Sequence, residues 1–485
     1  MVRRLSILNA IQIVLLCITF LQLVFIGTVV FLENRDPSRT VIWLLILGVL
    51  PILGSLLYLV FGRTASLRKL ARRKQLQQSK LTRLVENQKV ELSSDHIILG
   101  YAAPHKQKLV RILLNESSAP LTANNLVKVL TNGEETFSAL FAAMEGAKEH
   151  IHLEYYIFKD DEVGKDVLKI LSRKAADGVK VRVLVDGWGS RAITKRLHEL
   201  KREGIEAERF FPLRFPFISS RLNLRNHRKI VIVDGLQGFI GGLNVGDEYL
   251  SRSKKFGFWR DTFVKFEGEA VHFLQTVFLS DWQSVTHENI SGPGYFPSMG
   301  EIGKQLVQIA ASGPDSDWES LLQVYFTAMT SAEKRIYIET PYFIPDDSAM
   351  MALKTAALSN LDVRIIFQGV PDHLLTFWAS HSYFEELLEA GVRIYHYRKG
   401  ILHAKILIVD GEIGCVGSMN FDVRSFRLNF EISAFVYDQV FATRLEQDFN
   451  ADLAESEELL LEEFCQRPVS VRIKESAARL LSPLL

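Results

Sequence analysis

Apolar residues in the N-terminal region gather into two long, almost uninterrupted runs. The first extends from about residue 8 to 32 and the second from 41 to 61. Each reaches the roughly 20 residues that an α-helix needs to cross the hydrocarbon core of a bilayer. The pattern therefore predicts a transmembrane helical hairpin over residues 1–63.

Basic residues flank this predicted hairpin on its outer sides. Arg3 and Arg4 precede the first run, and a cluster of arginines and lysines follows the second between residues 63 and 74. Such residues collect on the cytoplasmic side, so both ends and the rest of the chain are predicted to be cytoplasmic. A cleaved signal peptide is the alternative for the first run, but residues 33–37 lack the small side chains of a cleavage site. Residues 64–129 are predicted to form a basic linker, either solvated or lying on anionic lipid.

The remainder of the chain repeats one order of strand and helix patterns. Segments 150–158 and 335–343 are both dense in β-branched and aromatic residues, which is typical of strands, and each has a glutamate at its fifth position, Glu154 or Glu339. Helical segments and further apolar strands follow in the same order. This alternation predicts an α/β fold of two similar α/β/α halves. The predicted boundaries are 130–290 and 300–460, with a C-terminal tail at 461–485.

A His-x-Lys-x-x-x-x-Asp motif occurs once in each half, with identical spacing. The motif residues are His227, Lys229 and Asp234 in the first copy and His403, Lys405 and Asp410 in the second. Each copy leads into a Gly-x-x-Asn tail that ends at Asn244 or Asn420. The duplication predicts a single active site to which both halves contribute.

Each motif includes a buried-strand pattern, at 230–233 and at 406–409, that ends in an Asp-Gly turn signal. Residues two apart lie on one face of a strand, so each histidine is predicted to project together with its lysine. The aspartates fall on the opposite face, at the end of the strand. Although they belong to the candidate catalytic motif, a supporting role at the turn is therefore predicted for them.

Two histidines, two lysines and two asparagines suit exchange at a phosphodiester. One imidazole can attack phosphorus while the other transfers a proton, because the reference pKa of histidine lies near 6.5. The lysines offer charge to the phosphoryl oxygens, and Asn244 and Asn420 are candidate phosphate-binding donors. No pattern of metal ligands occurs, so no metal is expected. The net charge of +1 argues against a nucleic-acid partner.

The duplicated motif resembles that of the phospholipase D superfamily, and the wider sequence is similar to bacterial cardiolipin synthases. The similar segments cover almost the whole chain and include Asn34–Pro37, Asp186–Gly189, Gly241–Tyr249, Trp259–Asp261, Glu339–Phe343, Gly417–Asp422 and Asn429–Glu431. The resemblance implies a multi-pass enzyme of the bacterial plasma membrane whose substrate is phosphatidylglycerol and whose product is cardiolipin. It implies no cofactor.

The resemblance also implies roles for individual residues. His227 is the nucleophile that forms a phosphatidyl-histidine, and His403 is the acid and base that first protonates the leaving glycerol. Asp261 and Glu431 are the carboxylates that orient the histidines. A second phosphatidylglycerol then accepts the phosphatidyl group.

Some alternatives remain open at this point. The same motif serves hydrolases, either a phospholipase D that makes phosphatidic acid or a nuclease, and a non-catalytic membrane scaffold is the third hypothesis. The aromatic segment 210–218 is predicted to be a lip that dips into the membrane, with burial between domains as its alternative. Phosphatidylethanolamine as a donor and the oligomeric state are not predicted.

Overall fold

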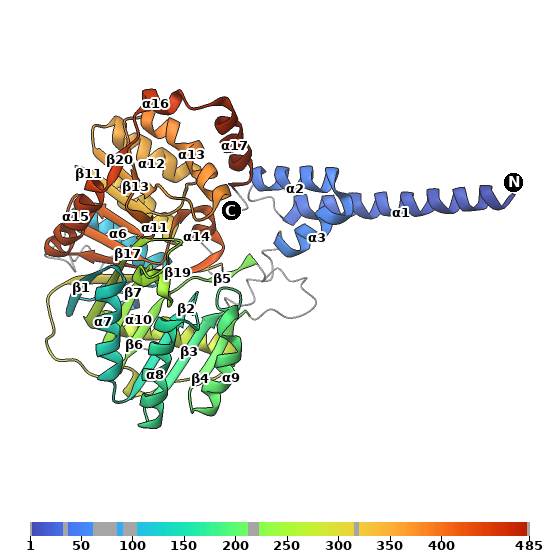
Figure 1. The fold of residues 1–485 in the computed structure, drawn as a ribbon. Coiled ribbons are helices and arrows are strands. Elements are labelled where there is room, and N and C mark those ends of the chain that lie inside the picture. The colour runs from blue at the N-terminus through green and yellow to red at the C-terminus, as the bar shows by residue number, and fades with distance from the viewer. Residues whose placement is uncertain are drawn as a thin grey trace. The chain divides into compact units, whose positions relative to one another are not determined.

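The computed structural model describes residues 2–32, 37–61, 85–90, 104–211, 223–314 and 320–482 (Figure 1). The chain divides into two compact units. One comprises Met1–Arg68 and Leu213–Leu224, and the other Lys69–Pro212 and Arg225–Leu485.

The first unit consists of helices α1 (Val2–Leu32), α2 (Pro37–Val49) and α3 (Pro51–Phe61). The second apolar run is thus divided into two shorter helices, because Pro51 has no N–H to continue α2 and restricts the residue before it. The ring of Tyr58 packs edge-on against Trp43, with their centroids 5.2 Å apart. Among the described residues, no helix is both long and apolar enough to cross a membrane. The two predicted spans are therefore not confirmed.

The first half of the second unit is a seven-stranded sheet in the order β1-β9-β7-β6-β2-β3-β4. Its strands are β1 (Asn125–Thr131), β2 (His150–Tyr155), β3 (Lys180–Asp186), β4 (Glu206–Phe210), β6 (Ile230–Val233), β7 (Gln237–Gly241) and β9 (Thr262–Gly268). Its helices are α7 (Asn132–Glu145), α8 (Glu162–Ala176), α9 (Thr194–Arg202) and α10 (Ala270–Thr286). Strands β2, β3 and β4 are parallel, and the other neighbours are antiparallel.

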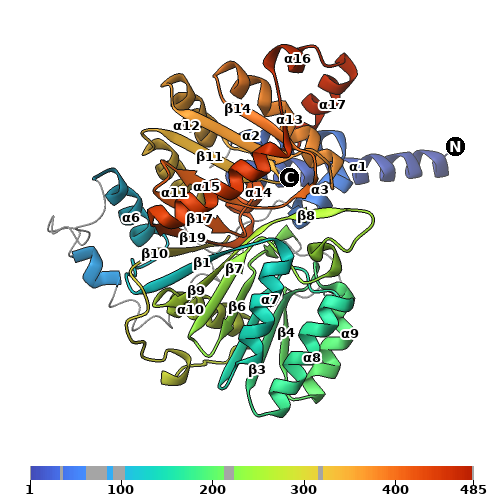
Figure 2. The same ribbon diagram turned by 60° about the vertical axis from the view of Figure 1, so that its left-hand side comes forward.

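The second half repeats this order in the path β10-β19-β17-β16-β11-β13-β14-β20. Its strands are β10 (Leu306–Ser312), β11 (Arg335–Thr340), β13 (Asp362–Gln368), β14 (Arg393–Tyr397), β16 (Ile406–Val409), β17 (Ile413–Gly417), β19 (Asn429–Tyr437) and β20 (Ser456–Glu458). Its main helices are α11 (Ser320–Thr330), α12 (Asp347–Leu358), α13 (Leu374–Glu389), α15 (Gln439–Ala454), α16 (Leu461–Cys465) and α17 (Val469–Leu480). The matching order agrees with a mixed α/β fold of two related halves. Figures 1 and 2 show the strands and helices of these halves.

Three boundaries differ from the prediction. Strand β1 begins at Asn125 and pairs with β9, so the first half starts before residue 130. Helix α6 (Pro104–Glu116) buries Leu109 and Leu113 in the hydrophobic core, so it is not part of a linker. Helices α16 and α17 extend the second half where a tail was predicted.

Candidate active site

Two short parallel strand pairs join the halves where the motifs lie. Strand β5 (Arg225–Asn226) pairs with β19 of the second half, and β8 (Phe258–Arg260) pairs with β15 (Gly400–Leu402). The chain continues from β5 into the first motif histidine and from β15 into the second. The N–H of His227 donates to the carbonyl of Phe430 at 2.9 Å, and the N–H of His403 donates to that of Arg260 at 2.7 Å. Each histidine is therefore fixed to a strand of the other half.

The imidazole rings follow the same crossed arrangement. His227 Nδ1 lies 3.0 Å from both carboxylate oxygens of Glu431, which belongs to the second half. His403 Nδ1 lies 2.8 Å from Asp261 Oδ2, which belongs to the first half. A proton on Nδ1 that is donated to the carboxylate leaves the lone pair on Nε2, which orients that nitrogen for chemistry. Each half thus supplies the carboxylate that orients the histidine of the other half.

Burial governs the protonation of these histidines. It lowers the pKa of His227 to about 4, with Lys229 adding to the shift and Glu431 opposing it. Burial, followed by the charge of Lys405, also lowers the pKa of His403. Burial alone would raise the pKa of Glu431, but the facing His227 and the nearby Lys229 hold it below its usual value. At neutral pH the pair is therefore a neutral imidazole beside a carboxylate.

The two motif lysines are buried close to the histidines. Lys229 Nζ donates to the carbonyl of His227 at 2.6 Å, and Lys405 Nζ lies 2.9 Å from His403 Nδ1. Burial lowers the pKa of Lys229 to about 7 and that of Lys405 to about 8. Both amines therefore titrate near neutral pH, and an anionic group bound beside them would favour their charged form.

The motif aspartates lie away from the histidines. Asp234 accepts hydrogen bonds of 2.8–2.9 Å from the N–H groups of residues 148–150 at the start of β2. Asp410 accepts equivalent bonds of 2.7–3.2 Å from residues 333–335 at the start of β11. Each aspartate is seven positions beyond its histidine along an extended strand, roughly 20 Å. Although both belong to the candidate catalytic motif, each aspartate therefore fastens a turn to a neighbouring strand, in agreement with the supporting role that the strand pattern predicts.

The two asparagines differ in their surroundings. Asn244 Oδ1 accepts the N–H of Ile157, and its Nδ2 donates to the hydroxyl of Tyr249, both at 3.1 Å. Asn420 is buried, and its Oδ1 has no hydrogen-bond partner within the described ranges. The side-chain amide of Asn244 thus already makes two hydrogen bonds within the protein. Phosphate binding by either residue stays a prediction.

Several groups near the site were not singled out as functional in the sequence. The ring of Tyr156 stands edge-on to His227, with centroids 5.0 Å apart, and Ser418 donates its hydroxyl to Glu431 at 2.5 Å. Glu154 is buried behind them and accepts a hydrogen bond from the Asn226 amide. Glu154 and Glu339 occupy the same place in the two repeats, and both are buried. This recurrence was the signal in the sequence that they share an environment in the fold.

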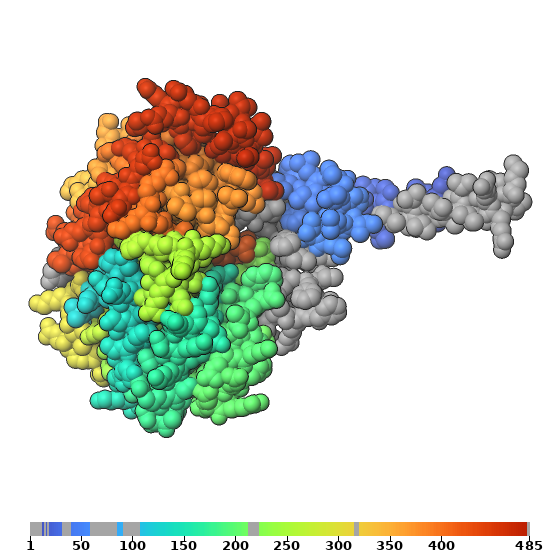
Figure 3. All heavy atoms as spheres, viewed as in Figure 1, coloured from blue at the N-terminus to red at the C-terminus, as the bar shows by residue number. Residues whose placement is uncertain are grey.

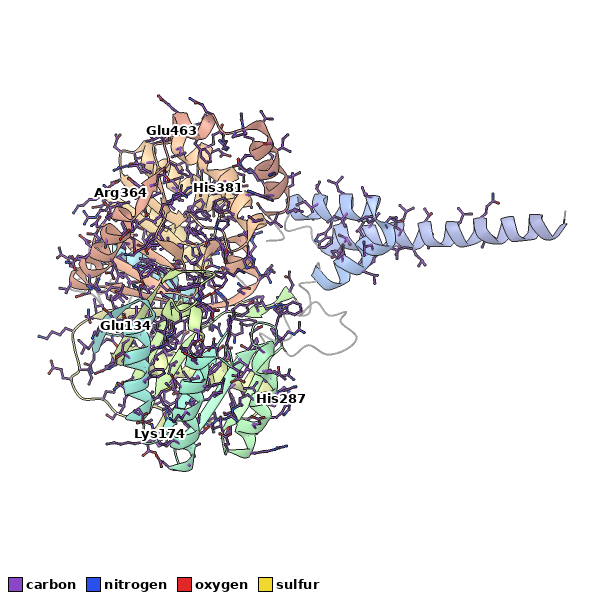
Figure 4. The ribbon with its side chains drawn as sticks, in the orientation of Figure 1. Glu134, Lys174, His287, Arg364, His381 and Glu463 are labelled. Carbon is purple, nitrogen blue, oxygen red and sulfur yellow. The ribbon has the colours of Figure 1, made fainter. Side chains whose placement is uncertain are left out.

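The hypothesis for the aromatic segment 210–218 meets the structure only in part. Of the aromatic segment 210–218, residues 212–218 lie outside the described residues, but Phe210 is buried and its ring centroid is 5.0 Å from that of Phe430. This favours burial between the halves for that residue. His381, labelled in Figure 4, is buried within the second half, where its Nδ1 lies 2.7 Å from the carbonyl of Phe377. It is not a surface histidine.

No group of three or more His, Cys, Asp or Glu side chains suited to a metal ion occurs in the part of the chain that the structure describes. The site offers instead two histidines, two lysines and the carboxylates that pair with them. This set can supply a nucleophile, an acid and base, and positive charge to a phosphodiester.

Comparison with known proteins places the chain in one family. The family model described as "Cardiolipin synthase, PLD-like domain" matches residues 140–282 and 325–453, and the model described as "Phospholipase_D-nuclease N-terminal" matches residues 20–63. A cardiolipin synthase of Geobacillus kaustophilus is 46% identical over 96% of this chain and 92% of its own length. The major cardiolipin synthase ClsA of Bacillus subtilis is 44% identical over 94% of this chain and 96% of its own length.

A solved structure supports the fold. The phosphatidylserine synthase of Haemophilus influenzae superposes with a TM-score of 0.61 and 18% identity, covering 78% of this chain and 100% of that protein. At this identity the likeness concerns the fold alone. The family model and the relatives of 44–46% identity show that the chain belongs to the phospholipase D-like cardiolipin synthases.

Proposed function

We propose that the protein transfers a phosphatidyl group from one phosphatidylglycerol to another, giving cardiolipin and glycerol. The observation that carries this proposal is the pair of crossed histidine–carboxylate contacts, at 3.0 Å and 2.8 Å, in a chain of this family. Two oriented imidazoles allow a substituted-enzyme reaction in which one phosphodiester is exchanged for another. No external energy source is needed, because the number of ester bonds to phosphorus is unchanged.

In the first step, His227 Nε2 attacks the phosphorus of phosphatidylglycerol. A P–N bond forms, and the P–O bond to the head-group glycerol breaks. His403 enters this step as an imidazolium, stabilised by Asp261 and by the anionic phosphate of the bound lipid, and gives its Nε2 proton to the departing oxygen. The low pKa of His227, about 4 because of burial, keeps this imidazole unprotonated at neutral pH. This supports its assignment as nucleophile. Glu431 stabilises the positive charge that develops on the ring once Nε2 is bonded to phosphorus.

In the second step, a terminal hydroxyl of another phosphatidylglycerol attacks the phosphatidyl-histidine. His403 takes the proton from that hydroxyl while the new P–O bond forms and the P–N bond breaks, which releases His227. Asp261 stabilises the imidazolium form of His403 in both steps. Lys229 and Lys405 neutralise the phosphoryl oxygens, and both are held near the histidines by their contacts with the histidine backbone carbonyls.

We also propose that the first unit holds the enzyme at the plasma membrane, with the catalytic part on the cytoplasmic side. Large apolar side chains are exposed along α1 and α3, among them Phe20, Leu23, Phe31 and Ile52. Contiguous apolar surface of this kind is typical of membrane or protein contacts. Insertion of the two apolar runs as a hairpin is the form of attachment that the basic flanks support.

Hydrolysis is the competing activity, because water could reach the phosphatidyl-histidine in place of a lipid hydroxyl. The test is to incubate the purified protein with phosphatidylglycerol in liposomes and to separate the lipid products. We expect cardiolipin and an equal amount of glycerol, and both should disappear in His227→Ala and His403→Ala. Phosphatidic acid as the main product would contradict the proposal.

A further inference from the structure

An exposed apolar rim lies beside one wall of the candidate active site. Tyr342 donates its hydroxyl to Asp372, which comes just before α13. Burial lowers the pKa of Lys405, and several nearby negative charges, among them that of Asp372, oppose this shift. Asp372 therefore lies within electrostatic reach of the site. Two residues further on, Leu374 and Leu375 expose 59% and 39% of their surfaces. The rim therefore begins two residues beyond a carboxylate whose charge acts on Lys405.

Helix α17 continues this rim. It packs along α13, where the Arg479 guanidinium donates to the carbonyl of Ser382 at 2.8 Å. Lys474 Nζ lies 5.3 Å from the ring centroid of Trp378. Since Trp378 and Leu374 are four residues apart on one helix, they share a face. The neighbourhood of Lys474 is thus continuous with the exposed leucines of α13.

The outward face of α17 is unusual for a helix on a water-soluble domain. Its acidic residue, Glu475, is buried and pairs with Arg467 at 2.9 Å. Its apolar residues Val469, Ile473 and Leu480 are instead 71%, 63% and 73% exposed. They occur at i, i+4 and i+11, which is one side of a helix. Figure 3 shows α17, in dark red, at the surface of its unit.

Cations accompany these exposed apolar side chains. The side chain of Arg472 is 52% exposed, and its ion pair with Glu385 is long, at 3.9 Å. Lys474 is exposed next to Ile473. Apolar residues that alternate with lysine and arginine suit the interface of an anionic bilayer, where the apolar groups enter the acyl boundary and the cations meet phosphate. A protein partner would not need this charge, whereas phosphatidylglycerol bears a negative charge.

We propose that a docking face made of Leu374, Leu375, Val469, Ile473, Lys474 and Leu480 lies on the anionic bilayer and presents the active site to its lipid substrates. This inference rests on the proposed function, because it assumes that the substrate is a membrane lipid. The face lies on the catalytic unit itself, so it acts in addition to any attachment through residues 1–63.

The direct test uses a fluorescent probe on the docking face of the full-length protein in liposomes that contain phosphatidylglycerol. An environment-sensitive dye is attached at Ile473→Cys, in a background with Cys17→Ser and Cys465→Ser, while the buried Cys415 is kept. The control carries the dye at Leu358→Cys. Leu358 is 70% exposed, but it ends α12 before the start of β13, whereas the rim follows the end of β13, roughly 20 Å away.

We expect the dye at position 473 to shift to shorter wavelength and to be quenched by lipids that carry a quencher in the upper acyl chain. The dye at 358 should show neither effect. Absence of quenching at 473 would overturn the inference. A wavelength shift without quenching would also overturn it, because it would indicate cover by protein, either another copy or another part of this chain.

Activity gives a second, independent measure. The double variant Ile473→Ser, Lys474→Glu should lose about tenfold or more activity on phosphatidylglycerol liposomes, because it loses an inserted side chain and reverses a charge at the lipid surface. It should keep wild-type activity on a short-chain phosphatidylglycerol below its critical micelle concentration, as should Leu358→Ser on both substrates. Equal loss on both substrates would contradict docking. Cardiolipin synthesis by the wild type without quenching at 473 would refute this inference and leave the proposed function standing.

Discussion

Replacement of Glu431 by glutamine tests the crossed arrangement of the site in detail. The change keeps the size of the side chain but removes the charge that faces His227 at 3.0 Å. Two unit charges about 4 Å apart in an environment of effective dielectric 20 interact by about 4 kcal/mol. This interaction stabilises the imidazolium formed when phosphorus bonds to His227. Its loss should slow formation of the phosphatidyl-histidine by about a thousandfold.

The assay compares two donors that differ in their leaving group. Phosphatidylglycerol needs a proton on its departing glycerol, whereas phosphatidyl-p-nitrophenol releases a stable anion and needs none. Glu431→Gln should be slow with both donors, because its defect lies with the nucleophile. Asp261→Asn should be slow with phosphatidylglycerol but release a burst of p-nitrophenol near the wild-type rate, because its defect lies with the acid.

A buried carboxylate away from the site provides the control. Glu475→Gln removes a buried charge on α17 that pairs with Arg467, and it should leave the p-nitrophenol burst unchanged. Thermal unfolding of all variants separates loss of fold from loss of chemistry. The reasoning is refuted if Glu431→Gln stays within about tenfold of the wild type, or if the two variants exchange their responses to the leaving group.

Three further predictions follow from the structure. In Gly242→Ala the new Cβ would meet Asp261 Oδ1 at 2.1 Å, so cardiolipin synthesis should fall at least about a hundredfold, whereas Gly294→Ala, which meets nothing within 4 Å, should keep full activity. Asp234→Asn should lower the free energy of unfolding in guanidinium by about 1–3 kcal/mol by weakening the bonds to β2, with little change in the turnover of folded enzyme; a lost turnover with unchanged stability would contradict its structural role. The free energy of unfolding should also fall as the pH drops from about 6.5 towards 4, because burial lowers the pKa values of histidines such as His152, His227 and His396 in the folded protein. The unfolded chain then binds more protons than the folded one, which costs up to about 1.4 kcal/mol per pH unit for each histidine. Guanidinium midpoints at pH 7 and pH 5 measure this loss, and equal midpoints would contradict the lowered pKa values.

The central strands of both halves could be predicted from the sequence almost to the residue. The predicted segments 230–233 and 406–409 coincide with β6 and β16. Both strands are buried on two faces, so their sequences are continuous apolar runs that stand out from their surroundings. The Asp-Gly turns that end them gave a second local signal. Prediction succeeded where local sequence and burial agree.

The crossed contacts could not be predicted in the same way. Glu431 lies 204 residues from His227, and Asp261 lies 142 residues from His403. The resemblance to the family implied the two carboxylates but did not show that each reaches the other half. That exchange depends on the β5–β19 and β8–β15 pairings, which are short and carry no pattern of their own. Long-range pairing of two- and three-residue strands is a property of the folded unit.

In the N-terminal region, prediction from the sequence failed for a different reason. Average hydropathy predicts one continuous helix over residues 41–61, but the structure ends α2 at Val49 and begins α3 at Pro51. A single proline outweighs the apolar composition because it removes a backbone donor. In α17, the outward apolar face and the buried Glu475 reverse the usual pattern, so periodicity alone did not identify the helix as part of the second half.

Identification of the residue that carries the phosphatidyl group tests the central claim most directly. Wild type and the His227→Ala and His403→Ala variants are mixed with radiolabelled phosphatidyl-p-nitrophenol, quenched in alkali, where a phosphoramidate survives, and mapped by peptide mass spectrometry. We predict a stoichiometric adduct on His227 in the His403→Ala variant and none in the His227→Ala variant. An adduct on His403, or on a residue outside both motifs, would contradict the account.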